Sequence, residues 1–281
     1  MAENTKIEWC DHTVNLWHGC AKVHTGCKNC YAETQAKRWG FDIWGENKDR
    51  KEIKSAFKDL EKYEKQAKET GKKAVVFIGS MMDIFEGSKP LVNTKGEKMV
   101  YTTASPFIKL FTEITGGKYD NLIFLFLTKR PQNIGKMLER YSEIPKNVWF
   151  GTSISDQQTA NELVPVLMRE TPKGANLFLS VEPQVANIGL TSIPLEWDEH
   201  RLNALTGKIT FPDGTCNELV NNKIRWIIQG GESGIRKREF KTEWAYFLKT
   251  QCKNAGVPYF FKQIDKVRPI PPDLLIREKP F

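Results

Sequence analysis

Three of the six cysteines in this chain, Cys20, Cys27 and Cys30, lie within eleven residues in the segment LWHGCAKVHTGCKNCYAE. Thiolates are soft ligands that suit both zinc and iron–sulfur clusters. In a reducing compartment, clustered cysteines bind metal more often than they form disulfides. The spacing Cys27-x-x-Cys30 matches one half of an ordinary four-ligand zinc site. The segment therefore predicts a metal site, although the fourth ligand of a closed site is not obvious.

Two metal groups compete for these thiols. A structural zinc site would take its remaining ligands from residues nearby in the sequence, namely Cys20, His18, His24 or Cys10. Such sites usually combine two ligand pairs from two places in the chain, and no second Cys or His pair follows. The remaining cysteines, Cys216 and Cys252, are far apart. A [4Fe–4S] cluster held by three thiolates would instead leave one iron open to a ligand, and both alternatives stay open at this point.

The composition is that of a soluble globular protein with an excess of positive charge. The formal net charge is +8 and the pI about 9.0, a balance that favours anionic partners such as nucleic acid but also serves solubility alone. No apolar run approaches the roughly 20 residues needed to span a bilayer. The first residues lack the charged start and apolar middle of a signal peptide, so we expect a cytoplasmic protein without membrane contact.

Six short apolar runs are nearly continuous in β-branched and aromatic residues, which is typical of strands buried on both faces of a parallel sheet. They cover residues 74–83, 121–131, 147–155, 176–183, 224–233 and 257–265. A further strand, TVNLWHG, is expected directly before the cysteines. Helical patterns lie between these runs, at residues 30–40, 105–116, 156–170 and 241–256.

The ends of these helices have recognisable residues. Ser105 and Asp156 are expected as N-caps, and Gly116 and Gly256 as stop signals, while Pro165 should kink or shorten its helix. Strands that alternate with helices predict βα units with right-handed crossovers. The sequence thus favours an α/β fold, a partial (βα)6 TIM-like barrel, with a doubly wound open sheet as the alternative.

Two segments interrupt the alternation of strands and helices in what we expect to be a single domain over residues 1–281. Residues 41–73 are highly charged and predict an inserted, solvated helix. Residues 188–222 contain Pro-Asp-Gly, which predicts a hairpin insertion.

Polar residues follow most of the predicted strands at their carboxyl ends, where ligands bind in barrels and open α/β sheets alike. Any one of them is more readily explained as a helix cap or a loop hydrogen bond. Together they predict one lined cavity. They are Ser80, Asp83, Thr128, Lys129, Arg130, Thr152, Ser153, Ser180, Glu182, Gln229, Gly230, Gly231, Glu232 and Ser233.

The chain resembles the radical S-adenosylmethionine (SAM) superfamily and, more closely, a phage and bacterial group of proteins with the motif C-x6-C-x2-C. The resemblance covers most of the chain, from KIEWCDHTVNLWHGCAKVHTGCKNCYAE through FIGSMMDIF, LTKRP, NVWFGTSIS, LSVEP and WIIQGGESG to EWAYFLKTQCKNAGVPYFFKQ. Most superfamily members use C-x3-C-x2-C, whereas six residues separate Cys20 from Cys27 here. The usually aromatic position before the last cysteine is Asn29, with Tyr31 just after it.

The resemblance implies a set of roles around a [4Fe–4S] cluster. Cys20, Cys27 and Cys30 would each ligate one iron, and SAM would chelate the fourth through its amino and carboxylate groups. An electron from a flavodoxin- or ferredoxin-type donor would then cleave SAM to methionine and a 5′-deoxyadenosyl radical, which abstracts hydrogen from a substrate. The resemblance names no catalytic side chain, and Cys10 is a candidate hydrogen donor only because it is near the cluster in sequence.

The same resemblance suggests where SAM would lie. Ser80 and Asp83 occupy the position of the turn that normally holds the amino group, and Ser153 and Glu182 are expected to contact ribose or carboxylate. Gly230 and its neighbour in the GGE sequence would let backbone approach the adenine. The remaining cofactor contacts are expected from Tyr31, Gln229 and Glu232.

The expected substrate is a nucleotide or a base in DNA, such as a modified thymidine-type base that is modified or isomerised, or a damaged pyrimidine. Lys129, Arg130, Arg236, Lys237 and Arg238 would offer cations to phosphate, and Trp17, Trp39 and Trp44 could stack on a base. A base within a duplex would have to be flipped out. In a phage-encoded protein the compartment would be the host cytoplasm. Two alternatives remain, a small-molecule radical SAM enzyme and a non-catalytic zinc-binding nucleic-acid or protein adaptor.

Overall fold

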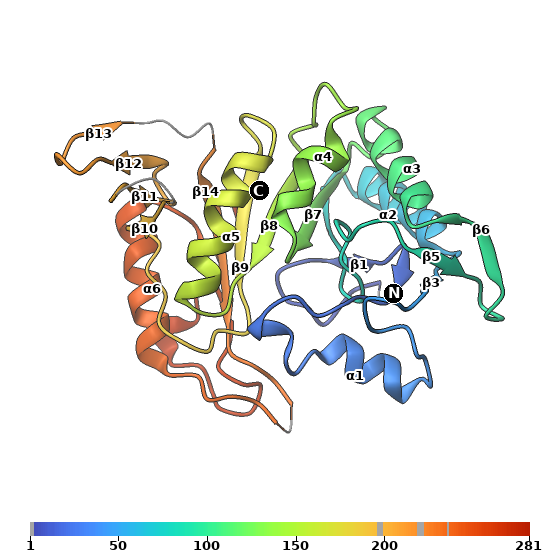
Figure 1. The fold of residues 1–281 in the computed structure, drawn as a ribbon, viewed down its shortest axis with the longest axis horizontal. Coiled ribbons are helices and arrows are strands. Elements are labelled where there is room, and N and C mark those ends of the chain that lie inside the picture. Colours follow the sequence, from blue (N-terminus) through green and yellow to red (C-terminus); the bar gives the residue numbers. More distant parts are fainter. Residues whose placement is uncertain (1–2, 196–198, 218–221, 235) are drawn as a thin grey trace. The chain divides into compact units, whose positions relative to one another are not determined.

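The computed structural model describes residues 3–195, 199–217, 222–234 and 236–281, and Figure 1 traces them by colour along the chain. The chain divides into two compact units. The first contains Met1–Val23 and Cys30–Trp149, and the second contains His24–Asn29 and Phe150–Phe281. The short piece His24–Asn29 carries Cys27, the middle cysteine of the motif. The two flanking cysteines, Cys20 and Cys30, belong to the first unit.

The core of the first unit is a set of parallel strands that pair in the order β1-β4-β7. These are β1 (His12–Val14), β4 (Ala74–Ile78) and β7 (Leu122–Thr128). Val76 in the middle strand lies opposite His12 on one side and Phe124 on the other. Almost every residue of β4 and β7 is buried, which confirms the prediction from their continuous apolar runs.

Helices α1 (Tyr31–Arg38), α2 (Ala56–Thr70), α3 (Ala104–Thr115) and α4 (Ile134–Leu138) belong to the same unit. α3 buries Phe107 and Phe111, and the latter ring stacks on Phe126 of β7 at 4.9 Å. Its N-cap is Thr103 rather than the predicted Ser105. The predicted stop at Gly116 is confirmed.

Helix α2 corrects the prediction of a wholly solvated insertion. The helix exists, but one face is buried and contacts β1, β4 and β7. Leu60 and Tyr63 lie on this face, and the Tyr63 ring stacks on the imidazole of His12 at 3.8 Å. Its charged residues form the opposite face, so α2 is an amphipathic helix that covers the sheet.

The predicted strand TVNLWHG is divided in two. β1 ends at Val14, and the second piece, β2 (Trp17–His18), belongs to a separate small sheet. The break has a local cause, because Asn15 turns its amide group toward the end of β4 and bonds there to Ser80 and Met81. The other strands of the small sheet are β3 (Arg50–Glu52), β5 (Pro90–Val92) and β6 (Lys98–Thr102).

The second unit repeats the alternation of strands and helices. β14 pairs in parallel with both β9 and β15, and β8, whose first two residues belong to the first unit, precedes them in the order β8-β9-β14-β15. The strands are β8 (Val148–Ser153), β9 (Asn176–Val181), β14 (Ile224–Gly230) and β15 (Tyr259–Gln263). Parallel strands alternating with helices in both units confirm the α/β class.

Helices α5 (Gln157–Glu170) and α6 (Thr242–Ala255) have the predicted ends. Asp156 caps α5 and forms a capping box with Thr159. Gly256 ends α6 with φ 65°, a left-handed conformation that favours glycine. Pro165 is accommodated inside α5. None of the described helices is long and apolar enough to cross a bilayer.

The hairpin expected within residues 188–222 is present as part of a small antiparallel sheet (Figure 1). Its turn lies at Pro-Asp-Gly, where Phe211 and Thr215 are joined by a backbone hydrogen bond of 2.9 Å. The strands are β10 (Ile193–Pro194), β11 (Arg201–Asn203), β12 (Lys208–Thr210) and β13 (Cys216–Asn217). Residues 196–198 and 218–221 of this predicted insertion lie outside the described part of the chain.

The described residues also contain three short 3₁₀ helices. They are η1 (Thr25–Cys27), η2 (Pro131–Asn133) and η3 (Pro272–Leu274).

Candidate functional site

Cys20 lies near the carboxyl ends of the strands in the first unit. Its sulfur is 3.8 Å from Nη1 of Arg130, which follows β7, and its carbonyl accepts a 2.9 Å hydrogen bond from the backbone N–H of Gly45. Burial raises the pKa of the Cys20 thiol to about 12; the carboxylate of Asp83 adds to this and the guanidinium of Arg130 opposes it. Burial and Asp83 thus favour the neutral form of this thiol.

Asp83 was predicted to bind the amino group of SAM, and the structure shows its carboxylate bonded within the protein. Oδ1 accepts hydrogen bonds from the hydroxyl of Thr128 at 2.6 Å and from the backbone of Phe85 at 3.1 Å. Oδ2 accepts from the backbone N–H of Lys129 at 3.0 Å and from Arg130 at 2.9 Å. These four bonds fill the acceptor capacity of the carboxylate, so Asp83 holds the ends of β4 and β7 together and positions Arg130.

Arg130 was predicted to offer its charge to substrate phosphate from the rim of a cavity. The structure instead buries it, with 7% of the residue exposed. Nη2 donates to the carbonyl of Ala21 at 3.1 Å and to Glu86 at 3.4 Å. Its cation is thus used inside the protein, next to Cys20. Lys129, the adjacent predicted substrate residue, is half-buried.

A second buried arginine supports this network. Arg50 on β3 is fully buried and forms a bidentate pair with Glu86, at 2.8 and 2.7 Å. Its guanidinium also donates to the carbonyls of Ile43, Gly45 and Lys48. Neither Arg50 nor Glu86 lies at a strand end that the sequence pattern marked, so neither was predicted as a site residue.

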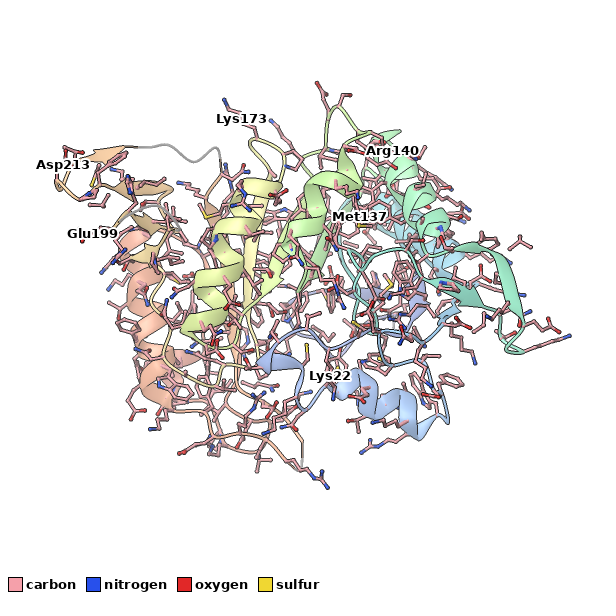
Figure 2. The ribbon with its side chains drawn as sticks, in the orientation of Figure 1. Lys22, Met137, Arg140, Lys173, Glu199 and Asp213 are labelled. Carbon is pink, nitrogen blue, oxygen red and sulfur yellow. The ribbon has the colours of Figure 1, made fainter. Side chains whose placement is uncertain are left out.

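Cys30 directly precedes α1, and its neighbour Tyr31 ties this helix to the end of β4. The Tyr31 hydroxyl donates to the backbone carbonyl of Ser80 at 2.5 Å. The Ser80 hydroxyl accepts a 2.8 Å bond from Asn15, whose own carbonyl accepts the backbone N–H of Met81 at 2.7 Å. Two predicted cofactor residues, Tyr31 and Ser80, are therefore in direct contact. Lys22, labelled in Figure 2, pairs with Glu33 of α1 at 2.7 Å. This ion pair links the cysteine loop to the helix.

In the second unit, residues 24–29 are held by side chains from the strand ends. The Thr25 hydroxyl donates to Asp156, just after β8, at 2.9 Å. Arg238, which follows β14, donates to the Thr25 carbonyl at 3.2 Å. Gly26 allows this close packing, because a Cβ at that position would lie 2.3 Å from the hydroxyl oxygen of Ser155. Cys27 itself is buried at the end of η1.

Glu232, predicted as a cofactor contact, clamps this same segment. Its Oε2 accepts hydrogen bonds from Asn29 at 2.9 Å and from the backbone and Nε of Arg238 at 2.9 and 3.1 Å, while Oε1 accepts Nη2 of Arg238 at 2.8 Å. Burial tends to raise the pKa of Glu232, but the bonds from Arg238 and Asn29 outweigh it and hold the pKa below its ordinary value. The structure therefore assigns Glu232 to positioning the residue next to Cys30.

The glycines of the GGE sequence are required by close packing. A Cβ at Gly231 would lie 2.0 Å from the carbonyl oxygen of Ile264, and one at Gly230 would lie 2.7 Å from Oε1 of Glu182. Glu182 pairs with Lys262 at 2.9 Å. Ser153 is buried at the end of β8. Glu182 and Ser153 thus lie at strand ends, as predicted.

Gln229 is placed differently from the prediction. It is fully buried, and its amide donates to Gln184 and to the backbone carbonyl of Trp244 on α6. Its carbonyl accepts the hydroxyl of Tyr259. These partners satisfy the side-chain amide of Gln229 inside the sheet–helix interface.

The basic residues after β14 have separate positions. Lys237 pairs with Asp265 at 3.0 Å, and Arg268 pairs with the same carboxylate at 3.1 Å. Arg236 is exposed, and its backbone carbonyl accepts a 2.9 Å bond from Asn29. Arg236 is thus the most accessible of the three predicted substrate cations in this loop.

Cys10 cannot serve as the hydrogen donor that its sequence position suggested. It lies before β1, and its neighbour Asp11 bonds to Val75 near the start of β4. The Cys10 side chain is buried and its sulfur is 3.8 Å from the carbonyl of Ile7. It therefore lies at the amino ends of the strands, opposite the end that carries Ser80 and Arg130.

Replacing Asp156 by Ala is expected to destabilise the fold by about 0.5–2 kcal/mol, because the Asp156 carboxylate caps α5 at the N–H of Thr159. Burial raises the pKa of Asp156, but the bonds from Thr159 and Thr25 outweigh it and lower the pKa below 3.8. A depressed pKa means that the stabilisation is present above the unfolded-state pKa and is lost as the pH falls through the folded-state value.

The measurement is urea denaturation of wild type and Asp156→Ala between pH 7 and pH 2. The difference in unfolding free energy should shrink as the pH falls below about 4. Gln158→Ala, which removes an exposed side chain in the first turn of the same helix, is the control and should change little. A difference that is constant with pH would contradict the charged cap.

The donor chemistry fits a soft metal group. All six cysteines are free thiols, and three of them lie in the loop that these contacts hold. In the described part of the chain, no three His, Cys, Asp or Glu side chains are grouped so that they could hold one metal ion. The fit therefore rests on the donor type alone, three thiols in one loop, which soft metals and iron–sulfur clusters accept.

Comparisons with known proteins place the chain in a family but do not name an activity. Neither the curated proteins nor the solved structures gave a match. One family, described as "Protein of unknown function (DUF5131)", matches residues 4–271. Since this match covers nearly the whole chain, the protein belongs to the DUF5131 family.

Proposed function

We propose that this protein is a radical SAM enzyme whose [4Fe–4S] cluster is held by Cys20, Cys27 and Cys30. We also propose that the α/β fold is a partial (βα) barrel of the radical SAM type. Its support is the resemblance of the motifs, the three free thiols in one loop and the contacts that fix that loop.

One observation carries the proposal. Each part of the cysteine loop is held by residues at carboxyl ends of parallel strands, through Arg130 for Cys20, Ser80 for the residue after Cys30, and Asp156 for Thr25. The carboxyl ends are where α/β folds bind their ligands. A purely structural zinc knuckle has no need of this placement.

The cluster and SAM would together supply, after one-electron reduction, a 5′-deoxyadenosyl radical that abstracts hydrogen from the substrate. The chain's own residues would bind and orient SAM. Ser80 is proposed for the amino group of SAM, because its hydroxyl oxygen accepts one bond from Asn15 and has capacity for a second. Glu182 and Ser153 are proposed for the ribose or carboxylate, and the backbone at Gly230 for the adenine. Clustered free thiols are typical of reducing compartments, so we propose that the protein is cytoplasmic, or lies in the host cytoplasm if a phage encodes it.

Anaerobic reconstitution followed by elemental analysis tests the proposal. We expect about four iron and four sulfide per chain, the composition of one [4Fe–4S] cluster, and little zinc. Stoichiometric zinc without acid-labile sulfide would contradict the proposal and favour the zinc-binding adaptor.

The proposed substrate is a nucleotide or a base in DNA, and the net charge of +8 supports an anionic partner. Trp39 supports this: it is 47% exposed, and its ring stacks on His18 with centroids 5.7 Å apart. Phe41 lies beside it at 6.0 Å, with the ammonium of Lys51 over the Phe41 ring. An exposed indole beside an aromatic ring that carries a cation is suited to stack on an unpaired base. A small acidic flavodoxin or ferredoxin is proposed as the electron donor on the same charge argument.

The other two tryptophans of the prediction are less suited to stacking. Trp17 is 1% exposed and fills the core, which corrects its assignment. Trp44 is half-buried, and its backbone pairs with that of Cys20.

Trp39→Ala is expected to weaken binding of a single-stranded oligonucleotide about 5–150-fold, since stacking on one base contributes about 1–3 kcal/mol. Fluorescence anisotropy at low salt measures it, and the salt dependence should stay unchanged because no charge is removed. Phe247→Ala is the control, as Phe247 on α6 is 44% exposed. Wild-type protein that binds no oligonucleotide at low salt would contradict the nucleic-acid substrate and favour the small-molecule enzyme.

A further inference from the structure

The guanidinium of Arg130 has an unusual pair of contacts. Nη1 lies 3.8 Å from the sulfur of Cys20, and Nη2 donates to the carbonyl of Ala21 at 3.1 Å. The fork therefore contacts one cysteine and the residue that follows it. Arg130 comes from the end of β7, 110 residues away in sequence, so this contact is built by the fold.

The orientation of this fork is fixed from behind. Asp83 accepts Nη1 at 2.9 Å and Glu86 accepts Nη2 at 3.4 Å. Glu86 is in turn held by the bidentate pair with the fully buried Arg50. A planar guanidinium held on two sides by carboxylates keeps its N–H groups in one direction, whereas a lysine ammonium would not.

The charges of this network balance, which decides how it acts on the sulfur. Two guanidinium groups, Arg50 and Arg130, face two carboxylates, Asp83 and Glu86. The sulfur of Cys20 therefore faces a directed N–H dipole rather than a net positive charge. Hydrogen bonds to the sulfurs of an iron–sulfur cluster are among the features that set its reduction potential, and they favour the more negative, reduced state.

We propose that Arg130 is a positioning residue for Cys20, whose N–H group bonds the coordinated sulfur and raises the reduction potential of the cluster. The inference rests on the proposed function and deepens it. Arg130 would then help the cluster to accept its electron, rather than bind substrate phosphate.

The test is a redox titration of the reconstituted cluster, followed by EPR, in Arg130→Met and Arg130→Lys. Arg130→Met should shift the midpoint potential to more negative values and change the g values, while Arg130→Lys should shift it less. Arg169→Lys is the control, because Arg169 of α5 pairs with the neighbouring Glu170 at 3.1 Å and takes no part in this network. Its potential should equal that of wild type.

Arg130→Met leaves Asp83 without its cation and could fail to fold, so Arg130→Met combined with Asp83→Asn keeps the charges balanced. The same negative shift is expected in that variant. Potentials and g values unchanged in the folded variants would overturn the role of Arg130 while leaving the cluster in place. A wild-type protein that takes up no cluster would instead overturn the proposed function, and the inference with it.

Discussion

Cys27→Ala is expected to lose its iron–sulfur cluster and all formation of 5′-deoxyadenosine from SAM. The proposal gives the cluster three protein ligands, and Cys27 is buried in the η1 segment that Thr25 and Asp156 hold in place. Groups that merely support metal ligands are worth about 10–100-fold in affinity or activity. Loss of a ligand should exceed that range, so product formation should fall more than about 100-fold.

The measurement is iron and sulfide content together with 5′-deoxyadenosine formed per chain under reducing conditions. Two other cysteines provide controls of different burial. Cys216→Ala changes an exposed thiol on β13, and Cys252→Ala changes a thiol on α6 that is 1% exposed. Both should retain the cluster. A Cys27→Ala protein that keeps its iron and its activity would contradict the ligand assignment.

Arg50→Met is expected to lower the free energy of unfolding by about 3–5 kcal/mol. The substitution removes a fully buried guanidinium and leaves the carboxylate of Glu86, 3% exposed, without its bidentate partner. It also leaves the buried carbonyl group of Ile43 without the donor that it now has. Urea denaturation at pH 7 measures the change, which should appear as a lower midpoint with an unchanged slope.

Lys65→Met is the control for this second prediction. Lys65 pairs with Glu69 at 3.9 Å on the exposed face of α2, where both side chains are largely in solvent, so its loss should cost about 0–1 kcal/mol. Arg50→Met combined with Glu86→Leu removes both charges and should recover part of the loss. An Arg50→Met protein as stable as the control would mean that the buried pair contributes little.

The strands were predictable because a strand buried on both faces leaves a continuous apolar run in the sequence. NLIFLFLT became β7, with its first residue just outside the strand. Helix ends were predictable where one residue type suits the conformation, as Asp156 and Gly256 show. The stripe of α2 was also present in the sequence, since Ala56, Leu60 and Tyr63 recur at helical spacing. The charged residues around this stripe led to the prediction of a solvated helix instead.

The candidate site was only partly predictable. The cysteines and the strand-end residues stand out by type and position. Their partners do not, because the contacts join residues distant in sequence, as with Asn29 and Glu232, 203 residues apart. For the same reason the sequence could not show that Arg130 is buried against Asp83 rather than offered to a substrate. Residue type gives the charge, but the fold determines its partner.

EPR of the reduced, reconstituted protein with and without SAM tests the central claim most directly. The account predicts a [4Fe–4S]⁺ signal that changes when SAM is added and is absent from Cys27→Ala. That result would establish an iron open to SAM. A protein that carries stoichiometric zinc and gives no cluster signal would contradict the account and return the three cysteines to a structural role.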